Sequence, residues 1–326
     1  MLTNSRLIAL FAVLAGALVF VLTRNGIALS PDSYAYLNAA WGMRLYGGIP
    51  ADFTWWPPLY PLTLAPFAGD TTMLLNAAKW LNAACYGLST AITLYALKTR
   101  LSGAGIAALG VVFLLAPPFD FVHRYVWSEP LFVTLTAAWF ALLLGGERSW
   151  RRVILLALVA ALLGLQRYVG LLFVPFGVFA LLLYRAHWKR IAVYAVIAFT
   201  PLALWMLRNV ALGYPATGLD RGAAYTTITN SMIYMLTTVA SWLPVLTLAC
   251  AVGWRYRVEL PSRFVVVAGY YAVGHALFIV WSSASTSMDE PDNRLLAPAF
   301  VACVYCAIAA GDYLRRKRIA QTKAPA

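Results

Sequence analysis

The sequence predicts an all-α, polytopic membrane protein with about ten transmembrane helices and a first outer loop that contains juxtamembrane helices. The mean hydropathy is +0.74. Of the 326 residues, 62% are hydrophobic and only 11% are charged, whereas soluble domains carry about 25% charged residues. Because no polar block is long enough to form a soluble domain, we expect one transmembrane domain over residues 1–326.

Ten apolar stretches approach the length of about 20 residues that crosses a bilayer. They cover residues 6–23, 72–97, 103–119, 126–145, 152–166, 168–185, 190–208, 232–252, 264–282 and 294–312. The first is long for a signal peptide and lacks a clear cleavage site, so we expect an uncleaved helix over 1–23. A first outer loop with juxtamembrane helices follows over 24–71, then the remaining spans over 72–312 and a cytoplasmic tail over 313–326.

The distribution of charge predicts the orientation. With ten spans both termini share one side, which holds 17 of the 25 basic residues and 3 of the 12 acids. These are Arg6, Lys98, Arg100, Arg148, Arg151, Arg152, Arg185, Lys189, Arg190, Arg255, Arg257, Arg263, Arg315, Arg316, Lys317, Arg318 and Lys323, with Glu147, Glu259 and Asp312. Basic loops stay in the cytoplasm. We therefore expect an inner (plasma) membrane protein with cytoplasmic termini. The net charge of +13 then reflects the basic cytoplasmic loops, and we expect no nucleic-acid partner.

The opposite, outer side holds the remaining nine acids and eight basic residues. These are Asp32, Asp52, Asp70, Asp120, Glu129, Asp220, Asp289, Glu290 and Asp292, with Arg24, Arg44, Lys79, Arg124, Arg167, Arg208, Arg221 and Arg294. Its loops are longer and more aromatic than the cytoplasmic ones. Loops held by a rigid scaffold often carry function, so we expect the active site on the outer face.

The segment from Ser30 to Pro61 contains the first candidate for catalysis. Ser30 and Pro31 predict a helix start, with Ser30 as the N-cap. Asp32 then lies in the first turn, with Tyr36 one turn further along the same face. A carboxylate in this place can accept a proton from a hydroxyl nucleophile. The alternative is an acid that only stabilises the helix through its dipole.

Aromatic residues in the same loop are candidates for binding a sugar or an acceptor. They are Tyr34, Tyr36, Trp55, Trp56 and Tyr60, and the last three belong to the motif WWPPLYP. Tryptophan and tyrosine rings stack on sugar rings, and they also gather at bilayer interfaces. The Pro57-Pro58 pair fixes the chain direction, which an interfacial belt alone does not require.

The loop between the third and fourth spans contains the candidates for a metal site. Asp120, His123 and Glu129 are metal-ligand types within ten residues. We assign them a supporting role, and a divalent metal ion is left open as the one candidate cofactor. The alternative is structural, because Ser128 before Glu129 and Pro130 also reads as the N-cap of a helix.

Arginines at outer helix ends are candidates for binding a donor phosphate. They are Arg124, Arg167, Arg208 and Arg294. Arginine binds phosphate through two parallel hydrogen bonds, although it can also extend to lipid headgroups. Arg167 is the most informative, because it lies where two short apolar stretches run together. The four cysteines all lie in apolar stretches and predict packing, with no disulfide framework.

Five stretches together resemble the GT-C superfamily of membrane glycosyltransferases, in particular bacterial relatives of protein O-mannosyltransferases and of the aminoarabinose transferase that modifies lipid A. They are PDSYAYLNAA (31–40), WPPLYPLTLAPF (56–67), RYVWSEPLF (124–132), LWMLRNVALGYPATG (204–218) and NRLLAPAF (293–300). The resemblance implies a catalytic first outer loop and a polyprenyl-phosphate-linked sugar donor. Asp32 matches the aspartate that activates the acceptor. Many relatives have a second acid beside it, where this sequence has Ser33. Larger relatives carry a soluble outer domain, which we do not expect after the basic tail of this chain.

The resemblance, together with these candidate residues, implies an inverting glycosyltransferase that acts on the outer face of the membrane. Its partners would be a polyprenyl-phosphate sugar, membrane lipid, and a glycan, lipid or protein that offers a hydroxyl group. The alternative is a flippase or carrier of a lipid-linked saccharide, which needs the aromatic residues and arginines but no carboxylate at Asp32. A carrier should place polar residues deep in several spans, whereas the polar residues here crowd one face.

Overall fold

The computed structural model describes residues 3–146, 149–218 and 222–323, and every regular element within these ranges is a helix. The elements are α1 (Asn4–Leu22), α2 (Pro31–Tyr46), α3 (Leu59–Leu64), η1 (Ala65–Phe67), α4 (Thr71–Leu97), α5 (Gly103–Leu114), α6 (Pro117–Val122), α7 (Glu129–Leu144), α8 (Trp150–Gln166), η2 (Tyr168–Leu172), α9 (Phe173–Leu183), α10 (Trp188–Ala211), α11 (Ile228–Tyr256), α12 (Ser262–Ser285) and α13 (Asn293–Lys323). Four residues counted in the charge pattern, Glu147, Arg148, Asp220 and Arg221, lie outside the described residues.

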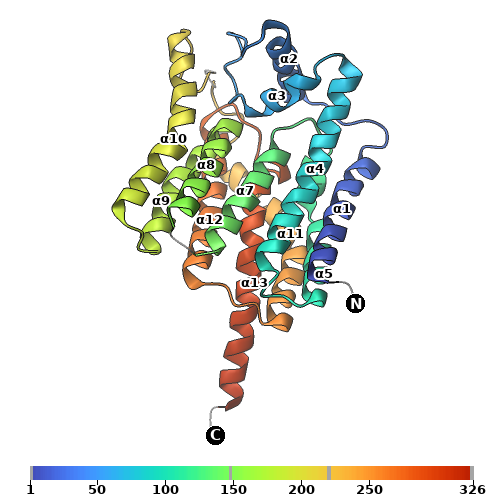
Figure 1. Ribbon diagram of the computed structural model, residues 1–326, viewed down its shortest axis with the longest axis vertical. Coiled ribbons are helices and arrows are strands. Elements are labelled where there is room, and N and C mark those ends of the chain that lie inside the picture. Colours follow the sequence, from blue (N-terminus) through green and yellow to red (C-terminus); the bar gives the residue numbers. More distant parts are fainter. Residues whose placement is uncertain (1–2, 147–148, 219–221, 324–326) are drawn as a thin grey trace.

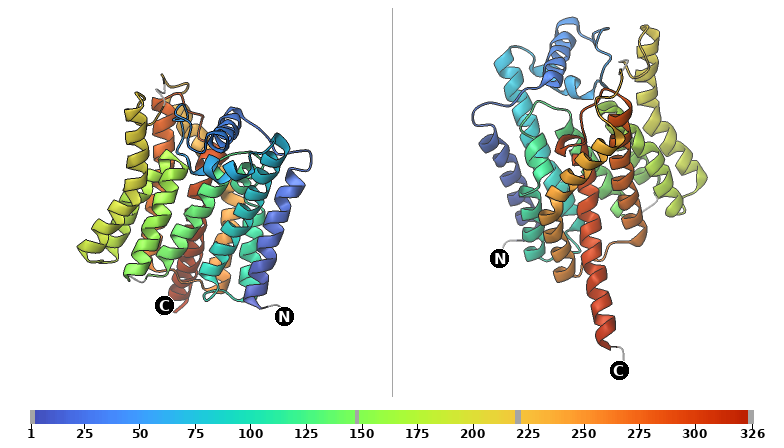
Figure 2. Two further views of the ribbon diagram at one scale, coloured as in Figure 1. Left: turned by 45° about the horizontal axis from the view of Figure 1, so that its top comes forward. Right: turned by 180° about the vertical axis from the view of Figure 1, so that it is seen from behind.

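The long helices stand side by side as a bundle, and α2 and α3 lie at one end of it (Figure 1). Helix α1 begins and α13 ends at the opposite end. Seen from behind, α13 runs through the bundle and continues well past its neighbours (Figure 2). The chain is thus a multi-pass helical membrane protein, with its first loop gathered at the end away from where α1 starts.

The predicted span 168–185 covers η2 and α9, the span 103–119 covers α5 and the beginning of α6, and each of the other eight coincides with one helix. Among the described residues, five helices are long and apolar enough by length and composition to cross a membrane, namely α1, α10, α11, α12 and α13. The all-helical membrane class is confirmed, whereas the number of ten spans stays a prediction.

Two boundaries differ from the sequence prediction for local reasons. Helix α5 stops at Leu114 instead of reaching residue 119, because Pro117 and Pro118 start the separate helix α6. Helix α13 continues to Lys323 through the expected tail. Neither glycine nor proline interrupts it there, and Asp312 accepts hydrogen bonds from Arg315 and Arg316, one turn along the helix, at 2.9 and 2.7 Å.

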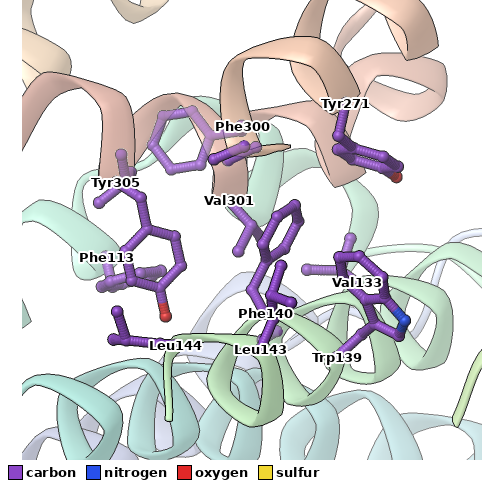
Figure 3. Packing of buried hydrophobic residues seen from close by; sticks show 14 of the residues in the cluster. Phe113, Val133, Trp139, Phe140, Leu143, Leu144, Tyr271, Phe300, Val301 and Tyr305 are labelled. Carbon is purple, nitrogen blue, oxygen red and sulfur yellow. The ribbon is translucent and has the colours of Figure 1, made fainter. Parts of the chain in front are cut away.

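The core is formed where α7 and α13 pass through the middle of the bundle. Figure 3 shows Phe140 and Trp139 of α7 packed among aromatic side chains of α12 and α13. The Phe140 ring is fully buried and meets the rings of Tyr271 and Tyr305 at 5.4 and 6.0 Å. Helices in a bilayer associate through such packing and through close backbone approach, so this core fixes the ends of α7 and α13 relative to each other.

A short backbone contact ties the first loop to the segment before α7. The amide of Ala28 donates to the carbonyl of Arg124 at 2.8 Å, and the amide of Val126 donates to the carbonyl of Ala28 at 3.1 Å. From α4, the Asn82 Nδ2 donates to the Tyr125 carbonyl at 2.7 Å. The start of α2 and the start of α7 are therefore fixed at the same end of the bundle.

Candidate active site

A cavity of about 660 Å³ opens at the end of the bundle that carries α2 and α3. Its walls come from α2, the starts of α7 and α13, the α8–η2 junction, α12 and three loops. The lining residues include Asp32, Trp55, Trp56, Glu129, Arg167, Tyr168, Thr217, Ser282, Met288, Asp289 and Arg294. Charged, polar and aromatic side chains from distant parts of the sequence thus face one space.

Two carboxylates and two guanidinium groups form an ion-pair network in the cavity wall. Arg294 Nη2 pairs with Asp32 Oδ2, and Arg294 Nε donates to Glu129 Oε1 at 2.5 Å. Arg167 Nη1 pairs with the same Glu129 oxygen. The Glu129 side chain is 2% exposed, Arg294 8%, Arg167 15% and Asp32 25%. Glu129 is therefore the buried centre, and Asp32 is the carboxylate most open to the cavity.

The start of α2 places Asp32, as the sequence predicts. The Ser30 hydroxyl accepts a hydrogen bond from the Ser33 amide at 3.4 Å, and the Ser33 hydroxyl accepts one from the Ser30 amide at 2.9 Å. Pro31 occupies the first turn. Ser33, the residue after Asp32, is fully buried and serves this capping box.

The break between α8 and η2 places Arg167. Helix α8 ends at Gln166, and Arg167 is extended, with φ −154° and ψ 146°. The chain then turns back tightly, and a Cβ at Gly170 would lie 2.1 Å from the Leu163 carbonyl oxygen. Gln166 also holds this junction to α7, because its Nε2 donates to the Ser128 carbonyl at 2.7 Å.

Ser128 does not act as the predicted N-cap. It precedes α7, but its side chain makes no capping hydrogen bond. Its hydroxyl instead accepts from Arg167 Nη1 at 3.0 Å and lies 3.1 Å from the Tyr36 hydroxyl. Its backbone φ of −76° and ψ of −15° are already helical rather than extended, which explains the absence of the cap.

Trp127 lies beneath the network. The Arg294 guanidinium carbon is 4.3 Å from the centre of the indole, and the indole Nε1 donates to the Ser30 hydroxyl at 2.7 Å. The Tyr125 ring stacks on the same indole at 4.0 Å, with an angle of 7° between the planes. Trp127 belongs to the RYVWSEPLF stretch but had no role in the sequence-based site.

The five predicted aromatic residues divide into three groups. Trp55 and Trp56 line the cavity. Tyr36 and Tyr60 are fully buried behind them, with their rings 5.1 Å apart, and burial raises the pKa of both phenols. Tyr34 is 57% exposed and does not line the cavity.

The proposed metal ligands are not brought together. His123 is fully buried, stacks on Tyr86 at 4.5 Å, and donates from Nδ1 to the Phe119 carbonyl. Burial lowers the pKa of His123 to about 4. Asp120 pairs with Arg124 one turn away, and Glu129 pairs with arginines. Within the described ranges, no three His, Cys, Asp or Glu side chains lie close enough to hold a metal ion.

Two of the four predicted phosphate-binding arginines lie outside the cavity lining. Arg124 pairs with Asp120 and does not line the cavity. Arg208 donates to the carbonyls of Pro50 and Phe53 at 2.7 and 3.1 Å and lies over the Trp205 ring. Arg208 therefore holds the first loop against α10.

Sequence reasoning missed several cavity residues. Asp289 Oδ2 lies 3.4 Å from Arg294 Nη1, and Tyr168 lines the cavity beside Arg167. Asp292 caps α13 by accepting from the amides of Arg294 and Leu295 at 2.9 and 3.0 Å. The four-residue run DEPD before Arg294 was the available signal, because an acid just before a helix start is a typical cap.

No protein-family model matches this chain, and no curated protein matches it in sequence. Among solved structures, ArnT from Cupriavidus metallidurans in the apo state aligns with a TM-score of 0.68 and 17% identity, over 96% of this chain and 61% of that one. The same protein bound to undecaprenyl phosphate aligns with a TM-score of 0.63 and 19% identity, over 91% and 59%. The chain spans about three fifths of the length of these structures.

The similarity extends over nearly the whole chain, so it concerns the arrangement of the entire bundle. It supports the resemblance of the five ordered stretches to membrane glycosyltransferases related to the aminoarabinose transferase. This chain therefore has the fold of these ArnT structures.

Proposed function

We propose that the protein is an inverting glycosyltransferase, which moves a sugar from a polyprenyl-phosphate-linked donor to a hydroxyl group of an acceptor. One observation carries this proposal: the Asp32 carboxylate and the Arg294 guanidinium lie side by side in the wall of one cavity. A group that can accept a proton and a group that can bind a phosphate are what such a transfer needs.

Asp32 is the better base of the two carboxylates in the network. Glu129 is 2% exposed and engaged by two arginines, whereas Asp32 is 25% exposed and borders the cavity. A general base must come within hydrogen-bonding distance of the proton that it removes. Asp32 can meet an acceptor there, and Glu129 instead orients Arg167 and Arg294.

The reaction that fits these positions is a single displacement. The acceptor oxygen attacks the anomeric carbon, its proton passes to Asp32, and the bond from that carbon to the phosphate oxygen breaks. The electron pair leaves with the polyprenyl phosphate, and the anomeric configuration inverts. Because Arg167 and Arg294 are already fixed by Glu129, they can stabilise the growing charge without reorganising.

The donor class has support from two sides. Arginine suits phosphate because its planar fork donates two hydrogen bonds at once. One of the similar structures, ArnT, contains undecaprenyl phosphate. Trp55 and Trp56 offer ring faces in the same wall for the sugar, with centroids 5.5 Å apart.

The outer face is the proposed location of the reaction. The cavity lies at the end of the bundle away from where α1 begins (Figure 1). The arginines and lysines that predict a cytoplasmic side, such as Arg315 to Arg318, follow the membrane-crossing part of α13 at the other end. A donor would then enter from the outer leaflet.

The direct test is a transfer assay on the purified full chain. Synthetic polyprenyl-phosphate sugars serve as donors, and release of free polyprenyl phosphate is measured with and without EDTA. Wild type should release it, and Asp32→Asn should lose about 10²- to 10⁴-fold in rate, the usual contribution of a general base. The EDTA arm decides whether a metal ion takes part.

Asp52→Asn is the matched control, because Asp52 is an exposed acid of the same loop outside the cavity lining. Its rate should equal that of wild type. Near-normal release by Asp32→Asn with an unchanged melting temperature would contradict the assignment of the base. No release with any donor, together with movement of labelled lipid across liposomes, would favour the flippase.

A further inference from the structure

Trp127 contacts both Arg294 and Ser30, the residue that caps the helix of Asp32. Its indole Nε1 donates to the Ser30 hydroxyl at 2.7 Å, and its ring lies 4.3 Å from the Arg294 guanidinium carbon. Ser30 is two residues before Asp32, at the N-cap of α2. One buried side chain therefore joins the two elements that carry the proposed base and its arginine partner.

The indole is itself held in place from the opposite side. The Tyr125 ring is nearly parallel to it at 4.0 Å, so Tyr125 covers one face and the guanidinium must lie over the other. The backbone of Tyr125 is fixed in turn by the bridge to Ala28 and by Asn82 from α4. Trp127 is 5% exposed. The support beneath Arg294 thus reaches into the helix bundle.

We propose that Trp127 is a positioning residue that keeps Arg294 and Asp32 aligned across the cavity. This inference rests on the proposed function. The indole face fixes the plane of the guanidinium, so that Nε points to Glu129 and Nη2 to Asp32. The indole N–H fixes the N-cap, and with it the first turn of α2. Trp127 touches no reacting atom in this scheme.

The geometry predicts different losses for two substitutions. Trp127→Leu removes both the aromatic face and the N–H group. Trp127→Phe keeps an aromatic face beneath Arg294 and removes only the N–H group. A cation lying over a desolvated aromatic ring gains a stabilisation equivalent to about 30-fold. We therefore expect Trp127→Leu to lower kcat by about that factor and Trp127→Phe to recover much of it, with the KM for the donor changing less than kcat.

Trp139 of α7 provides a matched control for the loss of a buried tryptophan. It is fully buried, and its Nε1 also donates to a side chain, the Tyr194 hydroxyl at 3.3 Å, but it does not line the cavity. Trp139→Leu should lower the melting temperature with little effect on kcat. If it lowers kcat as much as Trp127→Leu does, the effect of Trp127 is general destabilisation and the proposal is wrong.

A second measurement does not depend on turnover. Hydrogen–deuterium exchange is followed in peptides that cover the first two turns of α2, from Ser30 to Ala39. Trp127→Leu should speed exchange there, and Trp139→Leu should not. Unchanged exchange in Trp127→Leu would overturn the link between Trp127 and α2. Faster exchange in a protein whose wild type shows no transfer would leave the link standing and reject the proposed function instead.

Discussion

Arg294 donates from Nη2 to the Asp32 carboxylate although 262 positions separate the two residues in the sequence. The same guanidinium reaches Glu129 through Nε at 2.5 Å. One side chain at the start of α13 thus connects the partly exposed carboxylate of α2 with the buried carboxylate of α7. The planar fork of arginine can serve both partners, whereas an ammonium group cannot do so in the same geometry.

Arg294→Lys tests this double contact because it keeps the positive charge. We expect kcat for polyprenyl phosphate release to fall by about 10²- to 10³-fold, the usual cost of losing one fixed donor to a developing charge. Arg208→Lys is the control, since Arg208 contacts loop carbonyls outside the cavity lining. Equal rates in the two variants would show that Arg294 contributes charge alone.

Glu129→Gln tests the buried centre of the network. The substitution keeps the shape but removes the charge that faces Arg167 and Arg294, which are 15% and 8% exposed. Removing one partner from a buried ion pair costs about 3–5 kcal/mol. We expect a clearly lower melting temperature in detergent as well as loss of transfer.

Glu259→Gln is the matched control for Glu129→Gln. Glu259 is 67% exposed and pairs with Arg316, which is 53% exposed. Exposed pairs contribute about 0–1 kcal/mol, so its melting temperature should stay close to that of wild type. A melting temperature of Glu129→Gln as high as that of this control would mean that the buried network does not stabilise the fold.

The sequence allowed prediction of those parts of the site that depend on local chemistry. Ser30, Pro31 and Asp32 form the predicted helix start, because capping depends on neighbouring residues. The apolar stretches predicted where the long helices lie, since hydropathy over about 20 residues is a local property. Arg167 was recognised from its position at a break between two short stretches. In the structure, helix α8 ends at Gln166 and Arg167 is extended.

The pairing inside the site could not be read from the sequence in the same way. Glu129 was assigned to a metal set with Asp120 and His123, which are near it in sequence. Its partner Arg167 comes from the α8–η2 junction and its partner Arg294 from α13, and only the packing of the bundle brings them to it. Ser128 was expected to cap α7, but its side chain makes no capping hydrogen bond and instead accepts one from Arg167, which is distant in sequence.

Arg208 should control the order of the first loop. Its two hydrogen bonds to the carbonyls of Pro50 and Phe53 are the contacts that Arg208→Ala removes. We expect faster hydrogen–deuterium exchange over residues 48–54, while undecaprenyl phosphate binds with the affinity of wild type. Arg167→Ala should show the reverse, with weaker binding and unchanged exchange in this loop. Weaker binding in Arg208→Ala would restore its predicted phosphate-binding role.

His123 should make stability depend on pH. Burial lowers its pKa from 6.5 to about 4 in the folded protein. Between these values the unfolded chain binds more protons, so stability falls as pH drops from 6.5 toward 4 and is fully present above 6.5. By pH 5 the loss from this residue is about 2 kcal/mol. His123→Phe keeps a ring against Tyr86 but cannot titrate, so its melting temperature should vary less between pH 7 and pH 5. An unchanged pH dependence in this variant would assign the effect to other groups.

Gly170→Ala should disturb the placement of Arg167 without touching the cavity. A Cβ at residue 170 would lie 2.1 Å from the Leu163 carbonyl oxygen and 2.6 Å from the Gly164 nitrogen, which are both backbone atoms of α8. The α8–η2 junction must therefore shift, and Arg167 lies within it. A displacement of about 1 Å can cost about 100-fold in rate, so we expect a large fall in kcat.

Gly269→Ala in α12 is the control, because its Cβ would meet nothing within 4 Å. Alanine in a helix there should be neutral or slightly stabilising. Wild-type transfer by Gly170→Ala would mean that the junction yields without moving Arg167, and that its contacts with Glu129 and Ser128 are enough to position the arginine.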